Sequence, residues 1–147
     1  MSRKNARESA FKTIYEIPFH SDETPADIIN FCSKSEENKL TTKQDIDYFT
    51  NVTSVCFENL EHIDNKISLS LKDWTIDRIS KVDLSILRLA MAEIEFIEDI
   101  PYQVSINEAV ELAKKFSDDD SPAFINGVLA SSVNKWGSNA TNNRFTT

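Results

Sequence analysis

The sequence predicts an all-α fold, a compact bundle of about seven helices, from three observations. Apolar residues recur at spacings of three and four along most of the chain, the period of a helix with one buried face. Two glycines and four prolines among 147 residues are too few for the many tight turns of an all-β protein. Helix start and stop signals separate the apolar segments and set their approximate bounds.

The first predicted helix covers residues 3–17, and Pro18 ends it because proline cannot continue a helix. Thr24 and Pro25 then start a second helix, with the threonine as N-cap and the proline in the first turn. Four positions of the second helix are predicted to face inward: Ile28, Ile29, Phe31 and Cys32.

A polar loop is predicted over residues 33–41, and one long helix over residues 42–69. The long helix is predicted from a continuous apolar stripe, made of Ile46, Phe49, Val52, Val55, Cys56, Leu60, Ile63 and Ile67. Residues 74–80 are predicted to form a short helix or a turn.

A helix over residues 83–97 is apolar almost all round, with Asp83 as its predicted N-cap. A helix with this pattern has no face that prefers water, so it is predicted to lie at the centre of the bundle.

Two helices follow it. Ser105 and Glu108 make the S-x-x-E pattern of a capping box, which predicts a helix that starts at Ser105 and ends at Phe116. Ser121 and Pro122 predict the start of the last helix, with the serine as N-cap.

Both glycines belong to the last helical segment. Gly137 is predicted to cap its C-terminus. Gly127 lies within the helix, where glycine costs about 1 kcal/mol relative to alanine, so we expect another helix to approach closely there.

The chain is predicted to form one helical domain over residues 1–137, followed by a disordered tail over residues 138–147. The tail is polar, with one arginine and no acidic residue.

Charge is distributed unevenly along the chain. It carries 16 Lys and Arg against 24 Asp and Glu, a net charge of −8, which argues against a nonspecific nucleic-acid coat. Residues 1–12 hold four basic side chains and one acidic one, so the remaining residues carry −11. Such a chain can bind a polyanion at its basic corner and repel it elsewhere. On composition alone, a solvated first helical turn is the favoured explanation of the basic cluster, because runs of charge usually face water.

Enzyme chemistry has little support. His20 and His62 stand in no motif, and the acidic loop Asp118–Asp120 lacks the spacing of a calcium loop, so no metal or cofactor is predicted. Cys32 and Cys56 are isolated and are predicted to be buried thiols. The sequence shows neither a membrane span nor a signal peptide, and a cytoplasmic location is expected.

Three segments of the chain resemble one family. "PYQVSINEAVELAKKF" with "DSPAFINGVL", "RISKVDLSILRLAMAEI" and "RKNARESAFKTIY" are similar to the C-terminal, middle and N-terminal signatures of NusB, the bacterial transcription antitermination factors. Together they cover about a third of the chain, in the family's order. The resemblance implies a non-enzymatic protein built of two helical subdomains.

The resemblance also implies an RNA-binding surface made by the basic N-terminal segment and the turn between the last two helices. Arg3, Lys4 and Arg7 would meet phosphates, and Phe116 and Phe124 would stack on bases. Asp120 and Ser121 complete the turn, where the aspartate would accept from a base or a partner residue, and Tyr15 is a weaker candidate. On periodicity alone, both phenylalanines would be core residues.

The family implies a partner, the small-subunit ribosomal protein that acts as NusE. The heterodimer would bind the single-stranded boxA element of nascent RNA and help RNA polymerase resist termination, chiefly on ribosomal RNA operons. The basic opening of this chain is thin, which predicts weak RNA binding without the partner. The acidic side chains considered for partner binding are Asp77, Asp83, Glu93 and Glu95.

Two other readings stay open. Helical accessory domains of RNA methyltransferases resemble NusB, and such a domain would require a catalytic domain elsewhere in the protein. A helical homodimer that hides the RNA surface is the other reading, and the sequence does not decide between monomer and homodimer.

Overall fold

The computed structural model describes residues 2–20, 22–34 and 40–137. Seven α-helices and two short 3-10 helices make up the described part, and no strand occurs in it. In chain order they are α1 (Ser2–Glu16), η1 (Ile17–Phe19), α2 (Pro25–Ser33), α3 (Lys43–Glu58), α4 (Leu60–Ser70), η3 (Ile76–Arg78), α5 (Lys81–Phe96), α6 (Tyr102–Phe116) and α7 (Ser121–Trp136). The all-α prediction is confirmed. The predicted tail over residues 138–147 lies outside the described residues.

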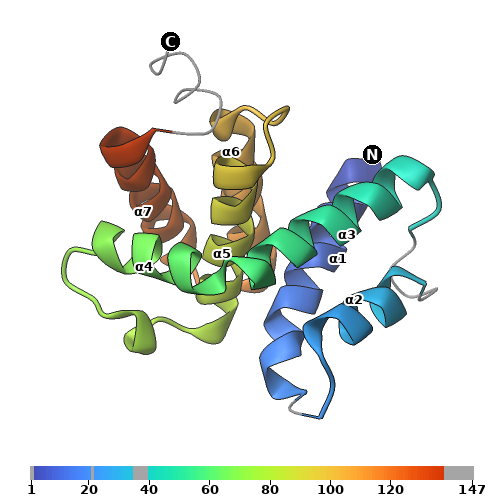
Figure 1. The fold of residues 1–147 in the computed structure, drawn as a ribbon. Helices are drawn as coiled ribbons and strands as arrows, with labels where there is room; N and C mark the ends of the chain where they lie inside the picture. The colour runs from blue at the N-terminus through green and yellow to red at the C-terminus, as the bar shows by residue number, and fades with distance from the viewer. Residues whose placement is uncertain (1, 21, 35–39, 138–147) are drawn as a thin grey trace.

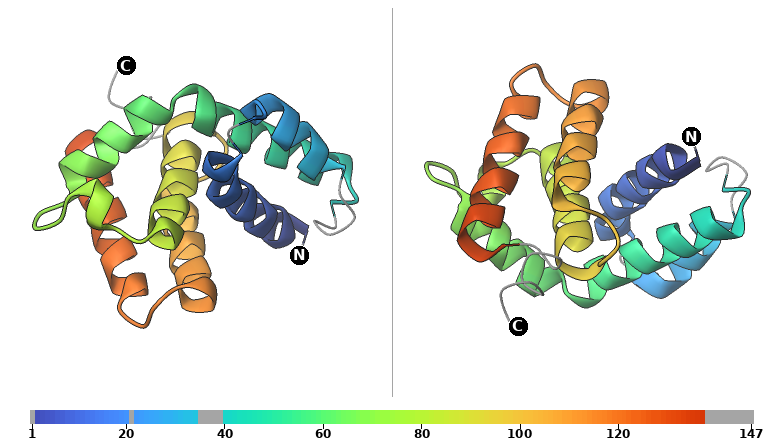
Figure 2. Two further views of the ribbon diagram at one scale, coloured as in Figure 1. Left: turned by 90° about the horizontal axis from the view of Figure 1, so that it is seen from below. Right: turned by 90° about the horizontal axis from the view of Figure 1, so that it is seen from above.

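The helices form two groups that share α5 (Figures 1 and 2). Helices α1, α2 and α3 pack on one another, and α4, α6 and α7 pack around α5. Helix α5 also contacts α1 and α3, so it joins the groups. Ten of its residues are buried, among them Ile86, Leu87, Met91 and Ile94. The prediction of a central buried helix is therefore confirmed.

The predicted helix over residues 42–69 is wrong, because it divides into α3 and α4 at Asn59. Asn59 leaves helical geometry, with φ −122° and ψ 26°, and its side-chain Nδ2 donates to the Val55 carbonyl at 2.9 Å. Asparagine often competes with helical hydrogen bonds in this way. The break lets α3 pack with α1 and α2 while α4 packs with α5 and α7.

Three helices begin differently from the starts that the sequence predicts. The N-cap of α5 is Ser80, whose Oγ accepts from the Asp83 N–H at 3.1 Å, so Asp83 is the third helical residue. Helix α6 begins at Tyr102, with Ser105 inside it. Helix α7 begins at Ser121, and its N-cap is Asp120. In contrast, the predicted caps Thr24 and Gly137 are confirmed, the glycine at a positive φ of 76°.

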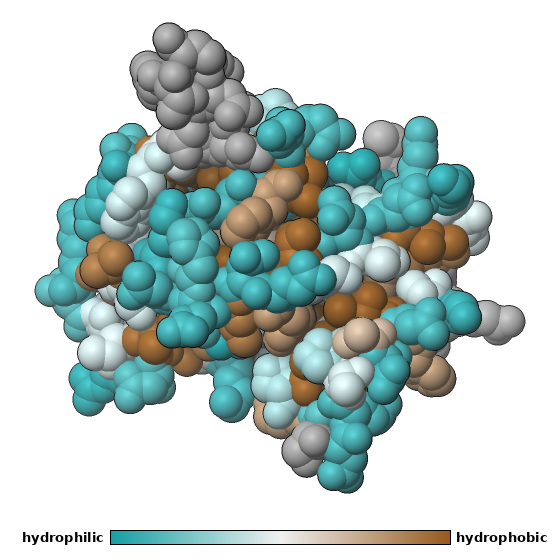
Figure 3. Space-filling view, in the orientation of Figure 1, coloured by the Kyte–Doolittle hydropathy of each residue, from teal (hydrophilic) through white to brown (hydrophobic). Residues whose placement is uncertain are grey.

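Two packing predictions also fail. Phe31, predicted to face inward from α2, is 73% exposed. No neighbouring helix approaches Gly127, since a Cβ placed there would meet nothing within 4 Å. In the view of Figure 3 the surface is largely hydrophilic, with apolar patches scattered among the hydrophilic residues.

Candidate nucleic-acid interface

Arg7 is an internal anchor of α1 and is only 5% exposed. Its Nε donates to Glu93 Oε2 at 2.7 Å and its Nη2 donates to Glu93 Oε1 at 3.2 Å. Its Nη1 lies 3.6 Å from an oxygen of Glu108 on α6. Burial opposes the charged form of the guanidinium, but the hydrogen bonds and charge of Glu93 outweigh this effect and raise the pKa of Arg7. A guanidinium held in this way is not free to meet a phosphate.

Glu93 gathers two further donors. The Tyr48 hydroxyl of α3 donates to Oε2, and the Ser105 hydroxyl of α6 donates to Oε1 at 2.8 Å. One carboxylate on α5 therefore accepts hydrogen bonds from α1, α3 and α6. Ser105, predicted to cap α6, serves this buried contact instead.

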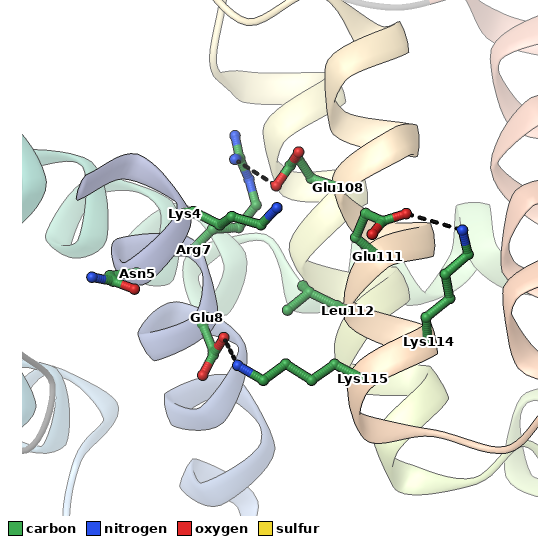
Figure 4. Close-up of a pocket in the computed structure, with 9 residues that line it drawn as sticks. All are labelled: Lys4, Asn5, Arg7, Glu8, Glu108, Glu111, Leu112, Lys114 and Lys115. Atoms are coloured by element: carbon green, nitrogen blue, oxygen red, sulfur yellow. Dashed lines mark hydrogen bonds and ion pairs between the residues drawn. The ribbon is translucent and has the colours of Figure 1, made fainter. Parts of the chain in front are cut away.

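Arg3 and Lys4 lie beside this anchor. The Arg3 guanidinium sits over the Tyr48 ring, with Cζ 4.5 Å from the ring centroid. Lys4 is exposed and lines a groove of about 340 Å³ between α1 and α6 (Figure 4). Within the described residues Lys4 has no ion-pair partner, so it is the predicted phosphate contact that is most available.

Four side chains join α1 to the end of α6, and we call them the Glu8 seam: Glu8, Lys12, Lys115 and Phe116. Lys115 Nζ donates to Glu8 Oε2 at 2.9 Å, a contact drawn in Figure 4, and Lys12 Nζ lies 3.5 Å from Glu8 Oε1. Both ammonium groups lie over the Phe116 ring, 5.4 Å from its centroid for Lys12 and 5.3 Å for Lys115. Phe116 also contacts Phe11 of α1, with ring centroids 5.2 Å apart. Phe116 is thus a packing residue of the interhelical contact.

The turn between α6 and α7 is held by Asp83, which is 8% exposed. Its Oδ1 accepts from the Ser117 hydroxyl at 2.5 Å, and its Oδ2 accepts from the Ser121 hydroxyl at 2.9 Å. Ser121 is itself buried, so its role is to fix the turn. Asp120 is exposed, and its side chain makes no capping hydrogen bond.

Phe124 and Phe116 have different neighbours. Phe124 is half-buried and lines two adjoining pockets with Trp74, which is 55% exposed. Arg78 and Asp120 border one of these pockets and Gly127 borders the other. The sequence predicted that both phenylalanines would lie together around the turn. In the structure Phe116 packs against α1, whereas Phe124 lines pockets with Trp74.

Tyr15 lies further along α1, 37% exposed. Its ring centroid is 5.5 Å from that of Phe19, which is 57% exposed. Lys81, the first residue of α5, has its Nζ 5.8 Å from the Phe19 ring centroid. An exposed aromatic pair beside a cation is suited to contact with unpaired bases.

The four acidic residues considered for partner binding are not equivalent. Glu93 and Asp83 are buried and their oxygens are already hydrogen-bonded, so neither presents a carboxylate to a partner. Glu95 is partly exposed and pairs with Lys66. Asp77 is exposed on η3, and a hydrogen bond from Thr75 lowers the pKa of its carboxyl. Asp77 is the most accessible of the four.

Other kinds of site find no support in the described ranges. No group of three or more His, Cys, Asp or Glu side chains there is arranged to hold a metal ion. Residues 2–20, 22–34 and 40–137 also contain no helix with the length and apolar character needed to cross a membrane. Cys56 is fully buried, and burial raises the pKa of its thiol to about 12, whereas Cys32 is partly exposed.

The arrangement is shared with solved structures of antitermination factors. T. maritima NusB superposes with a TM-score of 0.81 at 31% identity, covering 99% of this chain and 97% of that one. A chain in the crystal structure of antitermination factors NusB and NusE in complex with dsRNA gives a TM-score of 0.80 at 28% identity, covering 92% of this chain and 98% of that one. These matches define the class of protein by its all-α fold, which it shares with antitermination factors.

The sequence comparisons identify the family. Residues 4–134 match the model of the NusB family. The transcription antitermination protein NusB of Clostridium novyi (strain NT) is 42% identical over 135 residues, which are 90% of this chain and 98% of the relative. That of Natranaerobius thermophilus is 47% identical over 138 residues, with 92% and 96% covered. The chain belongs to the NusB family and is not an enzyme, which confirms the resemblance of its three signatures.

Proposed function

We propose that this chain is a transcription antitermination factor that acts with a NusE-type ribosomal protein. The pair binds the single-stranded boxA element of nascent ribosomal RNA in the cytoplasm and helps RNA polymerase resist termination. The observation that carries the proposal is the match over nearly the whole length to proteins named for antitermination. The similarity to a NusB bound to NusE and dsRNA supports RNA and NusE as ligands.

The geometry suggests a role for each residue of the interface. Arg3 and Lys4 meet phosphates, while Arg7 positions α1 through Glu93. Tyr15 and Phe124, both accessible at the surface, stack on bases. A second set completes the turn: Asp120 accepts from a base or partner, Ser121 fixes the backbone through Asp83, and Phe116 joins α6 to α1.

The acidic body favours a basic ribosomal partner, because opposite potentials accelerate and orient docking. We expect the partner to raise RNA affinity by at least about tenfold, a coupling free energy of about 1.4 kcal/mol. By linkage, RNA must tighten partner binding by the same factor.

The test measures binding of a short boxA RNA, a scrambled RNA and a boxA duplex to this chain with its NusE-type partner, at one stated salt concentration. The single-stranded boxA RNA should bind most tightly. Equal affinity for the boxA and scrambled strands would refute sequence-specific recognition. Preference for the duplex would refute the single-stranded ligand, and a homodimer that excludes RNA would appear in the same samples by size-exclusion chromatography.

Phe124→Ala tests the interface itself. Loss of one stacked base should weaken RNA binding by about 1–3 kcal/mol. Phe31→Ala is the control, because it makes the same truncation at an exposed aromatic residue on α2. A denaturation curve for each variant separates lost stacking from lost folding, since truncating a core phenylalanine costs about 3–5 kcal/mol of stability.

A further inference from the structure

The Glu8 seam has one carboxylate for two ammonium groups. Glu8 accepts from Lys115, 107 residues away on α6, and also pairs with Lys12 one turn along α1. Glu8 has a side chain that is 23% exposed, whereas the side chains of Lys12 and Lys115 are 56% and 62% exposed. The carboxylate is thus held between the helices while both cations reach solvent.

The charges around the seam leave it positive. Burial tends to raise the pKa of Glu8, but the hydrogen bond and charge of Lys115, together with Lys12, outweigh burial and lower that pKa. Glu8 is therefore ionised at neutral pH and cancels only one of the two lysine charges. Of the other acidic side chains of the groove, Glu111 accepts from Lys114, whereas Glu108 shares Arg7 with the buried Glu93. Lys4, which has no ion-pair partner among the described residues, adds a further cation to the same groove.

We propose that Lys12 and Lys115 together hold a phosphodiester group of the bound RNA, and that Glu8 competes with this phosphate for the two ammonium groups. The inference rests on the proposed function and assigns it two phosphate contacts and one opposing residue. A phosphodiester carries one negative charge on two free oxygens, so it can take the place of the carboxylate. The lysine heads act as mobile point charges and can turn from one anion to the other.

The position of the seam favours RNA over an acidic protein segment. Both lysine heads lie over the face of Phe116, and Lys4 lines the groove that continues from Glu8 and Lys115. Cations that follow one another along a groove match the repeating charge of a nucleic-acid backbone. Two of its residues, Glu8 and Lys12, also belong to residues 1–12, where basic residues are in excess.

Glu8→Gln should raise the affinity for a short boxA RNA, measured in the presence of the NusE-type partner. The expected gain is about fivefold, the effect of one unit charge about 4 Å away in water. Lys115→Met should lower affinity and reduce the slope of log affinity against log salt by about 0.7, the value for one single-strand contact. In the Lys115→Met background, the gain from Glu8→Gln should shrink because one of its two cations is gone.

An equivalent ion pair elsewhere supplies the controls. Lys43 and Asp47 are also four residues apart and their charged atoms are also 3.5 Å apart, but they lie on α3, which is across α1 from α6 (Figure 2). Asp47→Asn and Lys43→Met make the same changes in net charge as the seam variants. They should change RNA affinity much less. Thermal unfolding of every variant tests whether any effect comes from loss of structure.

The outcomes separate this inference from the function beneath it. If the parent pair binds boxA RNA but Glu8→Gln and Lys115→Met behave like the α3 controls, the phosphate contact of Lys12 and Lys115 is refuted. The proposed antitermination function is then unaffected. A loss of RNA affinity in folded Glu8→Gln would also refute competition, because it would make Glu8 a supporting residue. If the parent pair binds no RNA, both proposals fail together.

Discussion

Two buried carboxylates on the same helix are satisfied in different ways. Glu93 receives a bidentate arginine, a tyrosine hydroxyl and a serine hydroxyl. Asp83 receives two serine hydroxyls and, among the described residues, has no cation paired with it. Asp83 is 8% exposed and Glu93 is 1% exposed, so burial alone does not explain why one requires an arginine.

Their places along α5 explain the difference. Asp83 is the third residue of the helix, where the partial positive charge of the N-terminus stabilises an anion. Ser80 caps the same turn and accepts from the Asp83 N–H. Glu93 lies in the last turn, where the helix end is partially negative and disfavours an anion. A cation from another helix is therefore needed there, and Arg7 supplies it.

Each carboxylate fixes one half of the proposed RNA surface. Glu93 holds α1, which bears Arg3 and Lys4, and Asp83 holds the turn that bears Asp120 and leads to Phe124. Phe116 joins the two halves through its contact with α1. Helix α5 thus acts as the scaffold of the interface without presenting these two acidic groups to solvent.

The largest effect is expected from Arg7→Met, which removes the cation and leaves Glu93 buried. Breaking a buried ion pair from one side costs about 3–5 kcal/mol. Urea unfolding of the variant and the parent would measure the loss. Lys4→Met, a similar change three residues earlier at an exposed position, should have little effect on stability. A loss for Arg7→Met as small as the control's would mean that α5 stabilises Glu93 without a cation.

A smaller effect is expected from Ser121→Ala, which removes one of the two donors to Asp83. The remaining hydroxyl of Ser117 and the helix N-terminus still stabilise the carboxylate, so the cost should be about 1–3 kcal/mol. Ser131→Ala on the same helix is the control, because Ser131 is only partly buried. A cost above that of Arg7→Met would reverse the comparison and make the serine pair the more important anchor.

The sequence predicted these elements better than the connections between them. Ser105 and Glu108 fit a capping box, which is a local pattern, but Ser105 donates to Glu93 and Glu108 faces Arg7, about a hundred residues away. A hydroxyl followed by a carboxylate three residues later satisfies both arrangements equally well. Only the packing of α1 on α5 and α6 decides between them.

The same limit explains what was missed in the interface. Neither Lys12 nor Lys115 was among the predicted phosphate contacts, because nothing local in the sequence shows that Glu8 lies between them. The break at Asn59 is not visible in the apolar stripe, because α3 and α4 both direct their part of that stripe toward the core. In contrast, α5 was predictable because its apolar character does not depend on which neighbours cover it.

The smallest expected effect is a dependence of stability on alkaline pH, which the Glu93 cluster should show and the Asp83 cluster should not. Burial, and then the negative charge of Glu93, raise the pKa of Tyr48 well above its ordinary value of about 10. The unfolded chain therefore releases this proton first, so the stabilising contribution is complete below about pH 10 and is lost as the pH rises toward the folded pKa. The expected slope is at most about 1.4 kcal/mol per pH unit. The donors to Asp83 are serine hydroxyls, which do not titrate in this range.

Urea unfolding of the parent and of Tyr48→Phe, over a series of alkaline pH values, measures this contribution. Tyr48→Phe should be less stable than the parent near neutral pH, because Glu93 loses one donor, and the difference should narrow above about pH 10. Ser121→Ala should keep a constant difference from the parent across the same range. Parallel curves for all three proteins would show that the Tyr48 proton is released equally easily from the folded and unfolded chains. The Glu93 cluster would then be no more sensitive to alkali than the Asp83 cluster.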